Sequence, residues 1–452
     1  MTSKKVNRRD FLKLGAGALA TAGLANWPQA GLAAANPPSD YKAIVNIFFL
    51  GGNDGFNMVI PRSDFEYDEY AASRQNLAVA KSDLLAINPI TAGGAQYGLH
   101  PMMSEVQQLF SDGRLGVMAN VGNLIQPVTK AQLENPNTPR PRQLFSHNDQ
   151  QDQWRYGDPN TEQSGWGGRL MDYKIADNTN PLLTGMAIGG RSKWLVSQQN
   201  LDISINRNGF DNYSYVRPDA NWTQNRRTAF QSLLHQNYGN AFAQEFSGTQ
   251  KRTMDLVEQV GSLINDLPEF TTSLPEQQNR LAESLRMVGR MIAIREQLGM
   301  TRQVFYVAMG GFDTHDDQLQ NQPALLQQIS QALKYFYDLT VELGVENSVT
   351  SFTSSEFGRT LTSNGDGTDH AWGNHQLMMG GSVRGGDIYG TMPSLEIGGI
   401  DDYRDDGRII PTSSVEQYAK PILDWYGMDA NQLATILPNL SAFDANALDF
   451  ML

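Results

Sequence analysis

The sequence predicts an α/β protein in which helices flank a mostly parallel central sheet. The run at 43–50 is near-continuously apolar, as in a strand buried on both faces, and the runs at 304–309 and 347–353 are two further candidate strands. A helical pattern lies between the second and third runs, which is typical of a crossover between parallel strands. Each run also leads into a loop with glycine and polar residues, as at the ligand-binding edge of such sheets.

The first 35 residues predict a cleavable export signal. A basic stretch precedes a mild apolar run at 12–24, and small residues at 30–35 suit a cleavage site. The segment NRRDFLK at 7–13 is typical of the twin-arginine pathway. We therefore expect a mature chain of residues 36–452 that folds as one domain, uses the twin-arginine export machinery and is periplasmic or secreted.

The rest of the chain predicts further strands and helices in a clear order. Apolar residues at 115–121, and more weakly at 376–379, predict two more strands. One long helix is expected from about 275 to 298. A second begins with Pro323 in its first turn and ends before Gly344. The polar and aromatic segment at about 200–266 predicts a mainly helical insertion or cap.

Composition excludes several classes of protein. Cysteine is absent, so disulfides and thiolate chemistry are excluded. Removing the signal takes away five of 35 basic and one of 48 acidic residues, which leaves a net charge of −17. That charge disfavours nucleic acid or anionic lipid as a partner, although local charge still permits a small anionic substrate. No later stretch reaches the roughly 18 unbroken apolar residues that a membrane span needs.

Ligand-type side chains follow three of the predicted strands. Asp54 follows the first run, Asp313 and His315 follow the run at 304–309, and Glu356 and Arg359 follow the run at 347–353. Because the carboxyl ends of parallel strands meet at one edge, these side chains are expected to converge. Carboxylates and imidazoles together are ligands for divalent cations such as zinc, manganese or calcium.

The histidines of the chain add further candidate metal ligands. The chain has only six, and four lie in motif-like segments. The candidate metal ligands are therefore Asp54, Asp313, His315, Glu356, His370 and His375.

Each candidate also has a structural interpretation. Asp54 suits a turn, Asp313 suits a helix cap, and Glu356 with Arg359 suits a surface ion pair. His370 and His375 could serve packing and hydrogen bonding. All of these being structural at once is the less favoured interpretation.

The segment FSHNDQQ at 145–151 leaves two interpretations of Ser146 open. Its hydroxyl suits the cap of a helix that starts there. It equally suits a nucleophile at the positive end of that helix, beside a metal. His147 and Arg359 complete the candidate catalytic group, with Arg359 or Arg169 holding an anion by forked hydrogen bonds.

Motifs along nearly the whole chain resemble the twin-arginine-exported bacterial family called DUF1501, which is placed with the alkaline-phosphatase/sulfatase superfamily. The matching segments are FLGGNDGFNMVIP (49–61), LHP (99–101), FSHNDQQ (145–151), SGWGGR (164–169), RQVFYVAMGGFDTH (302–315), SEFGRT (355–360), TDHAWGNH (368–375) and RIIPTSSVEQY (408–418).

The resemblance implies an alkaline-phosphatase-like fold and a metal site. It would make Asp54 a metal ligand, Ser146 the nucleophile and Asp313 with His315 a ligand pair, completed by an acidic residue followed by histidine and by a final histidine. Here Phe357 follows Glu356, and the Asp313–His315 spacing is tighter than usual. These departures leave open a one-metal site or a loss of hydrolysis.

The leading functional hypothesis is an exported, metal-assisted hydrolase of phosphate or sulfate esters. The alternative is a non-catalytic periplasmic binding or assembly protein on the same fold. A mutase or transferase on this scaffold is a third possibility, which a periplasmic location disfavours.

Overall fold

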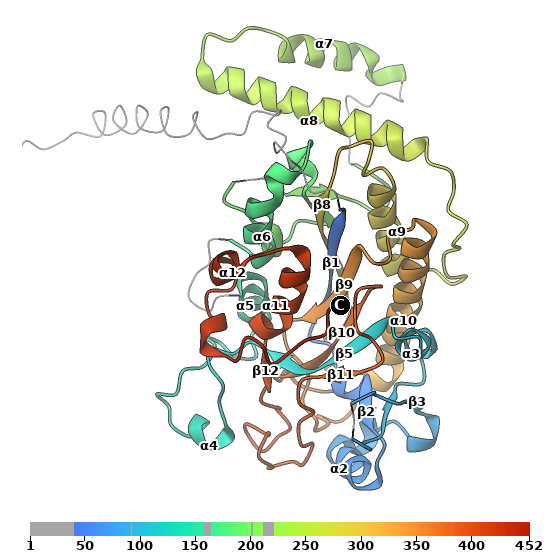
Figure 1. The fold of residues 1–452 in the computed structure, drawn as a ribbon, viewed down its shortest axis with the longest axis vertical. Helices are drawn as coiled ribbons and strands as arrows, with labels where there is room; N and C mark the ends of the chain where they lie inside the picture. Colours follow the sequence, from blue (N-terminus) through green and yellow to red (C-terminus); the bar gives the residue numbers. More distant parts are fainter. Residues whose placement is uncertain (1–39, 92, 158–163, 200–201, 211–220) are drawn as a thin grey trace, which may run out of the picture.

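A computed structural model describes residues 40–452, apart from 92, 158–163, 200–201 and 211–220 (Figure 1). The expected signal peptide lies outside the described residues. Within them, no helix combines the length and the apolar character needed to cross a membrane.

A nine-stranded central sheet organises the described residues. Its spatial order is β11-β5-β10-β9-β1-β8-β6-β7, with β12 paired to β5. Every pairing in it is parallel except those of β10, which runs antiparallel to both β9 and β5. The strands are β1 (Lys42–Leu50), β5 (Leu115–Gly122), β6 (Gly185–Ile188), β7 (Ile203–Ile205), β8 (Arg302–Gly310), β9 (Val349–Ser355), β10 (Asn374–Met379), β11 (Ile388–Tyr389) and β12 (Ser413–Ser414).

The predicted α/β class with a mostly parallel sheet is confirmed. All five apolar runs are strands, namely β1, β5, β8, β9 and β10. The strand β1 lies at the centre between β8 and β9, and its interior residues are buried. Burial on both faces explains why the run of β1 is almost continuously apolar rather than alternating.

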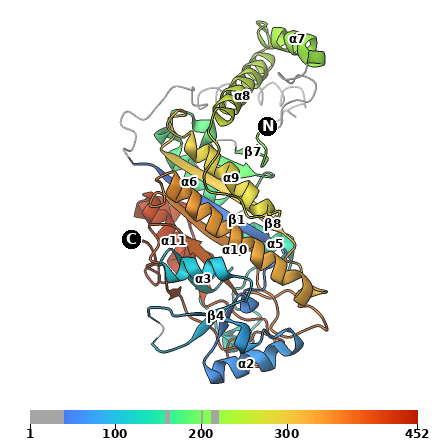
Figure 2. The same ribbon diagram turned by 90° about the vertical axis from the view of Figure 1, so that its right-hand side faces the viewer.

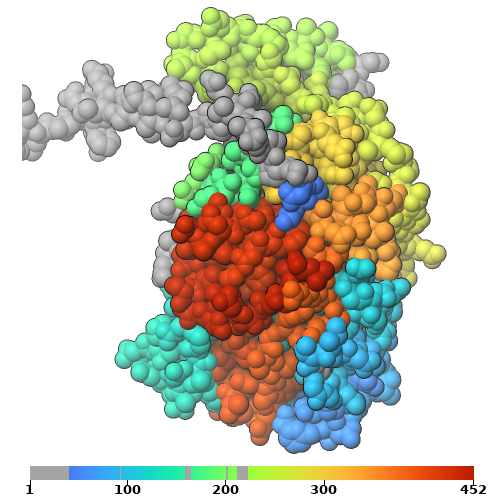
Figure 3. Space-filling view, in the orientation of Figure 1, coloured from blue at the N-terminus to red at the C-terminus, as the bar shows by residue number. Residues whose placement is uncertain are grey.

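Helices cover both faces of the sheet, so the fold has three layers (Figure 2). Alternate side chains of β1 enter opposite cores: Val45 and Ile47 face one, while Ile44 and Phe48 face the other. The first core is closed by α3 (Ser104–Ser111), α9 (Arg280–Ala293) and α10 (Gln318–Glu342), and the second by α6 (Trp166–Lys174), α11 (Val415–Tyr426) and α12 (Ala430–Ile436). The C-terminal segment occupies the middle of the face seen in the space-filling view (Figure 3).

Two helices differ in extent from their predictions. The helix α10 begins at Gln318, so Pro323 lies inside it rather than in its first turn. Residues 318–322 are polar apart from Leu319, so they carry no apolar periodicity and gave no sign of this earlier start. The helix α9 covers only Arg280–Ala293, and the expected residues up to 298 form turns before Gly299.

Two further groups of elements lie at the two ends of the molecule (Figure 1). A three-stranded antiparallel sheet contains β2 (Val59–Pro61), β4 (Tyr97–Leu99) and β3 (Leu85–Ile87), next to α2 (Asp64–Arg74). At the opposite end lie α7 (Gln224–Leu234) and α8 (Ala241–Asn265) (Figure 1). Both fall in the segment expected to be helical, but β7 in that segment belongs to the central sheet. The short α4 (Lys130–Leu133) precedes α5 (His147–Tyr156).

Candidate metal centre

The loops that follow β9, β1 and β8 meet at one edge of the sheet. Gly51, directly after β1, joins them: its N–H donates to Glu356 Oε1 (2.8 Å) and its carbonyl accepts from Arg359 (3.3 Å). Its φ of 119° favours glycine, and a Cβ there would fall against the Asp313 backbone. Glycine at this position therefore allows the three loops to approach one another closely.

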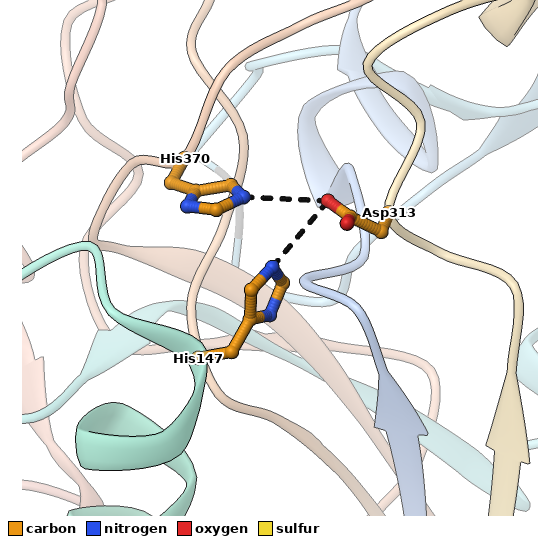
Figure 4. A group of neighbouring side chains, drawn as sticks. All are labelled: His147, Asp313 and His370. Atoms are coloured by element: carbon orange, nitrogen blue, oxygen red, sulfur yellow. Dashed lines mark hydrogen bonds and ion pairs between the residues drawn. The ribbon is translucent and has the colours of Figure 1, made fainter.

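Three imidazoles surround one oxygen of Asp313. The Nε2 atoms of His147, His315 and His370 lie 3.5, 3.2 and 3.3 Å from Asp313 Oδ1. His315 and His370 also bring their Nε2 atoms to 2.9 Å of each other. Figure 4 shows His147, from the start of α5, and His370 pointing at this carboxylate. One ligand atom each of His147, Asp313 and His370 lies within 4.8 Å of the other two.

The opposite ring nitrogen of each imidazole is held by an oxygen. His147 Nδ1 lies 3.0 Å from Glu356 Oε1, His315 Nδ1 lies 3.2 Å from Asp369 Oδ1, and His370 Nδ1 lies 2.7 Å from the Phe145 carbonyl. A carboxylate or carbonyl oxygen accepts, so these Nδ1 atoms donate. In neutral imidazoles this arrangement leaves three Nε2 lone pairs directed at Asp313.

Arg359 balances the charge of Asp313. Its guanidinium is fully buried and donates to Asp313 Oδ1 (2.9 Å) and to the Thr368 carbonyl (2.8 Å). Partial burial would raise the pKa of Asp313, but Arg359, His147 and His315 outweigh it and lower the pKa. Asp313 is therefore an anion at neutral pH, with its side chain 48% exposed.

Glu356 and His147 stabilise each other's charged forms. The hydrogen bond to Glu356 raises the pKa of His147, although partial burial opposes it. Burial alone would raise the pKa of Glu356, but hydrogen bonds from His147, from Gln151 (2.9 Å) and from the Gly51 backbone lower it instead. Glu356 therefore fixes His147 from behind rather than facing Asp313.

This donor set fits a divalent cation. Burial lowers the pKa of His370, so its Nε2 is unprotonated at neutral pH and faces a carboxylate oxygen. His147 Nε2 is buried and has no hydrogen-bond partner among the described residues. Lone pairs that face an anionic oxygen repel it unless a cation, a proton or a metal, lies between them. Imidazole nitrogens with one carboxylate are the ligands that zinc and similar ions prefer.

Phe145 has an unusual backbone that serves this centre. Its φ of 74° lies in the left-handed region, which is rare for a bulky residue. This conformation turns the Phe145 carbonyl toward His370 just before Ser146 and His147 begin α5. Strain of this kind persists only where surrounding structure holds it, and it is common at functional sites.

Asp54 is placed differently from its expected role as a metal ligand. Its buried carboxylate forms an ion pair with Arg74 of α2 and accepts from Gln318 Nε2 (2.5 Å). It also caps the short 3₁₀ helix at Gly55–Asn57. The turn interpretation of the Gly-Asn-Asp-Gly segment therefore describes its local geometry.

Three other candidate residues are also held by hydrogen bonds to protein groups. His375 lies in β10, fully buried, where its Nδ1 accepts the Asn120 N–H (3.1 Å). Ser146 occupies the N-cap position of α5 and donates to Asp149 Oδ2 (2.6 Å). Arg169 donates to main-chain carbonyls of Ser164, Tyr156 and Ile436.

Sequence reasoning missed Asp369 and the Phe145 carbonyl. Asp369 had a usable signal, since it directly precedes His370 in the segment TDHAWGNH. The role of Phe145 depends on its backbone conformation, which no residue pattern reveals.

Together the fold and the geometry define an α/β protein with a candidate His/Asp metal centre at the carboxyl ends of central parallel strands. The family model "Protein of unknown function (DUF1501)" matches residues 41–403, so the chain belongs to the DUF1501 family, as its motifs predicted. A comparison with curated protein sequences gives no match.

Three solved structures illustrate what the chain is similar to. One is the C-terminal periplasmic domain of EcEptC from Escherichia coli in complex with Zn (TM-score 0.36, 10% identity, 89% of this chain and 87% of that one). The others are the lipoteichoic acid synthase LtaP from Listeria monocytogenes (0.36, 6%, 90% and 80%) and the PsFucS1 sulfatase from Pseudoalteromonas sp. (0.32, 8%, 94% and 73%). At these TM-scores, no property of those proteins is assigned to this chain.

Proposed function

We propose that this chain is an exported, metal-dependent hydrolase of phosphate or sulfate esters, with the metal at His147, Asp313, His315 and His370. The observation that carries the proposal is the convergence of three Nε2 atoms on Asp313 Oδ1, each imidazole being held through Nδ1 by an oxygen. Oxygen acceptors behind metal-binding histidines fix the ring and its tautomer in many proteins.

The donor chemistry supports a zinc-like or manganese ion over calcium. Calcium prefers six to eight oxygen ligands, whereas here imidazole nitrogens outnumber the facing carboxylate. Such a metal supplies Lewis-acid chemistry, polarising an ester oxygen and lowering the pKa of a nearby hydroxyl.

The chain's own residues would then orient and balance this chemistry. Glu356 and Asp369 hold His147 and His315, while Arg359 fixes Asp313. Ser146, next to His147, is the candidate nucleophile, and Asp149 is placed to accept its proton. A Ser146→Ala variant separates this role from a water nucleophile, because only in the first case does it abolish turnover.

The proposed route out of the cytoplasm rests on the twin-arginine segment NRRDFLK. A non-catalytic binding protein is the second candidate. The observation that favours it is that Arg359, the expected anion holder, is already fully engaged with protein groups.

The decisive experiment is elemental analysis of the purified mature protein together with a screen of phosphate and sulfate esters, with and without a chelator. The variant is His315→Ala/His370→Ala, and the control is His235→Ala, an exposed histidine at the end of α7. Stoichiometric metal and chelator-sensitive hydrolysis, both lost only in the double variant, support the proposal. Metal without hydrolysis favours the binding protein. Absence of metal rejects the metal-dependent hydrolase and also favours the binding protein.

A further inference from the structure

Two arginines border the proposed centre on its Phe145 side. The guanidinium carbons of Arg404 and Arg408 lie 5.1 and 5.0 Å from the centre of the Phe145 ring. Arg408 Nε also donates to the His370 carbonyl (2.9 Å). Because the Phe145 carbonyl holds His370 Nδ1, both arginines are one residue away from a proposed metal ligand.

Arg404 forms no ion pair within the loop at 398–408, although this loop also carries four aspartates. Asp405 forms an ion pair with Lys130, and Asp406 forms one with Arg408. The exposed Arg404 side chain has no ion pair or hydrogen bond within the parts of the chain that the structure describes. Its guanidinium donors are therefore free to bind an anion from solvent.

The loop holds Arg404 in a defined position. The buried Asp402 carboxylate accepts the backbone N–H groups of Gly398 (3.0 Å), Arg404 (3.3 Å) and Gly407 (3.0 Å). The Arg404 guanidinium also lies 5.1 Å from the Tyr403 ring centre. Hydrogen bonds to the backbone and two aromatic rings reduce the ordering that anion binding would require.

We propose that Arg404, stacked against Phe145 and Tyr403, binds a second anionic group of a substrate whose reacting ester lies at the metal centre. The substrate class is thus an ester with at least two negative charges, such as a multiply sulfated or phosphorylated sugar. This inference rests on the proposed function. In a mature chain of net charge −17, a guanidinium without an ion pair beside the centre gives such substrates a local attraction.

The test measures binding rather than turnover, so that it does not depend on hydrolysis. Calorimetry at low ionic strength compares a disaccharide that bears two sulfate groups with the same disaccharide that bears one. The proteins are the metal-loaded mature wild type, Arg404→Glu, Arg404→Lys and the control Arg384→Glu. Arg384 follows β10 at the opposite edge of the sheet and makes an exposed ion pair with Asp449. Arg384→Glu therefore changes the net charge as much as Arg404→Glu does, but away from the centre.

Wild type is expected to prefer the disulfated ligand by about tenfold, the size of one charge-assisted contact. Arg404→Glu should abolish this preference, Arg404→Lys should retain part of it, and Arg384→Glu should keep it. No preference in wild type, an unchanged preference in Arg404→Glu or an equal loss in Arg384→Glu would each overturn the proposal. If only the proposed function fails, the wild type still prefers the disulfated ligand but hydrolyses no ester.

Discussion

Asp54 and Asp313 both follow the end of a central strand, yet their neighbours give them different surroundings. Asp54 is buried against Arg74, while Asp313 is half exposed and faces three imidazoles. The same residue type in two similar loops thus serves a packed ion pair in one and a candidate ligand in the other.

Replacing each carboxylate by its amide should separate these roles. Asp313→Asn is expected to lose bound metal because it removes the central anionic ligand, with a small effect on stability at this exposed position. Asp54→Asn should keep the metal but lower the free energy of unfolding by about 3–5 kcal/mol, because Arg74 then remains buried without its anion. Elemental analysis measures the bound metal of each variant, and urea unfolding measures its free energy of unfolding. Metal loss in Asp54→Asn alone would contradict the assignment.

His375 should make the protein less stable in acid. Burial lowers its pKa to about 3, whereas an unfolded histidine titrates near about 6.5. The contribution of neutral His375 to the free energy of unfolding is therefore complete above about pH 6.5. It declines by about 1.4 kcal/mol per pH unit as the pH falls toward 3. His375→Gln keeps an acceptor for the Asn120 N–H without a proton to gain. Unfolding of both metal-free proteins between pH 6 and 4 should show the steeper decline in wild type, and equal slopes would refute it.

At the scale of elements, β1 was predictable because burial on both faces imposes an almost continuous apolar run. The direction of β10 was not predictable, because an apolar run does not show which way its strand runs. Its antiparallel pairing depends on the neighbouring strands. Strands of two to four residues such as β6, β11 and β12 are too short to show any period.

The candidate centre was predictable in its strand-end loops but not in its partners. Asp313, His315 and His370 lie in recognisable motifs. The pairing of Asp54 with Arg74 was not predictable, because it depends on how α2 packs against the loop after β1. The orientation of His147 by Glu356 likewise joins residues 209 positions apart.

The helix α10 offers a matched test of its packing. Leu326 is fully buried on the sheet face, whereas Leu319 of the same helix is 53% exposed. Leu326→Ala should lower the free energy of unfolding by about 2–5 kcal/mol through lost burial and a residual cavity. Leu319→Ala should change it by no more than about 0.5 kcal/mol. Denaturant unfolding measures the free energy of unfolding of both variants. Similar values for the two variants would show that α10 does not pack as described.

At the scale of the whole molecule, export is tested through the arginine pair. Arg8→Lys/Arg9→Lys preserves charge but should block export nearly completely, because the pathway requires the arginines themselves. The control Lys4→Gln/Lys5→Gln removes two charges and leaves the pair intact. Cell fractionation should find full-length precursor inside the cell only for the arginine variant. Normal export of that variant would exclude the twin-arginine route.

The central place of β1 has a consequence for the order of synthesis. This strand is the first of the sheet to be made, but its partners β8 and β9 begin at residues 302 and 349. At ribosomal rates of about 5–20 residues per second, β1 waits roughly 10–50 s before either partner emerges. The sheet therefore closes only late in translation, after a long and slow loop closure. A transport route that accepts finished, folded cargo suits such a chain better than one that threads it as it is made.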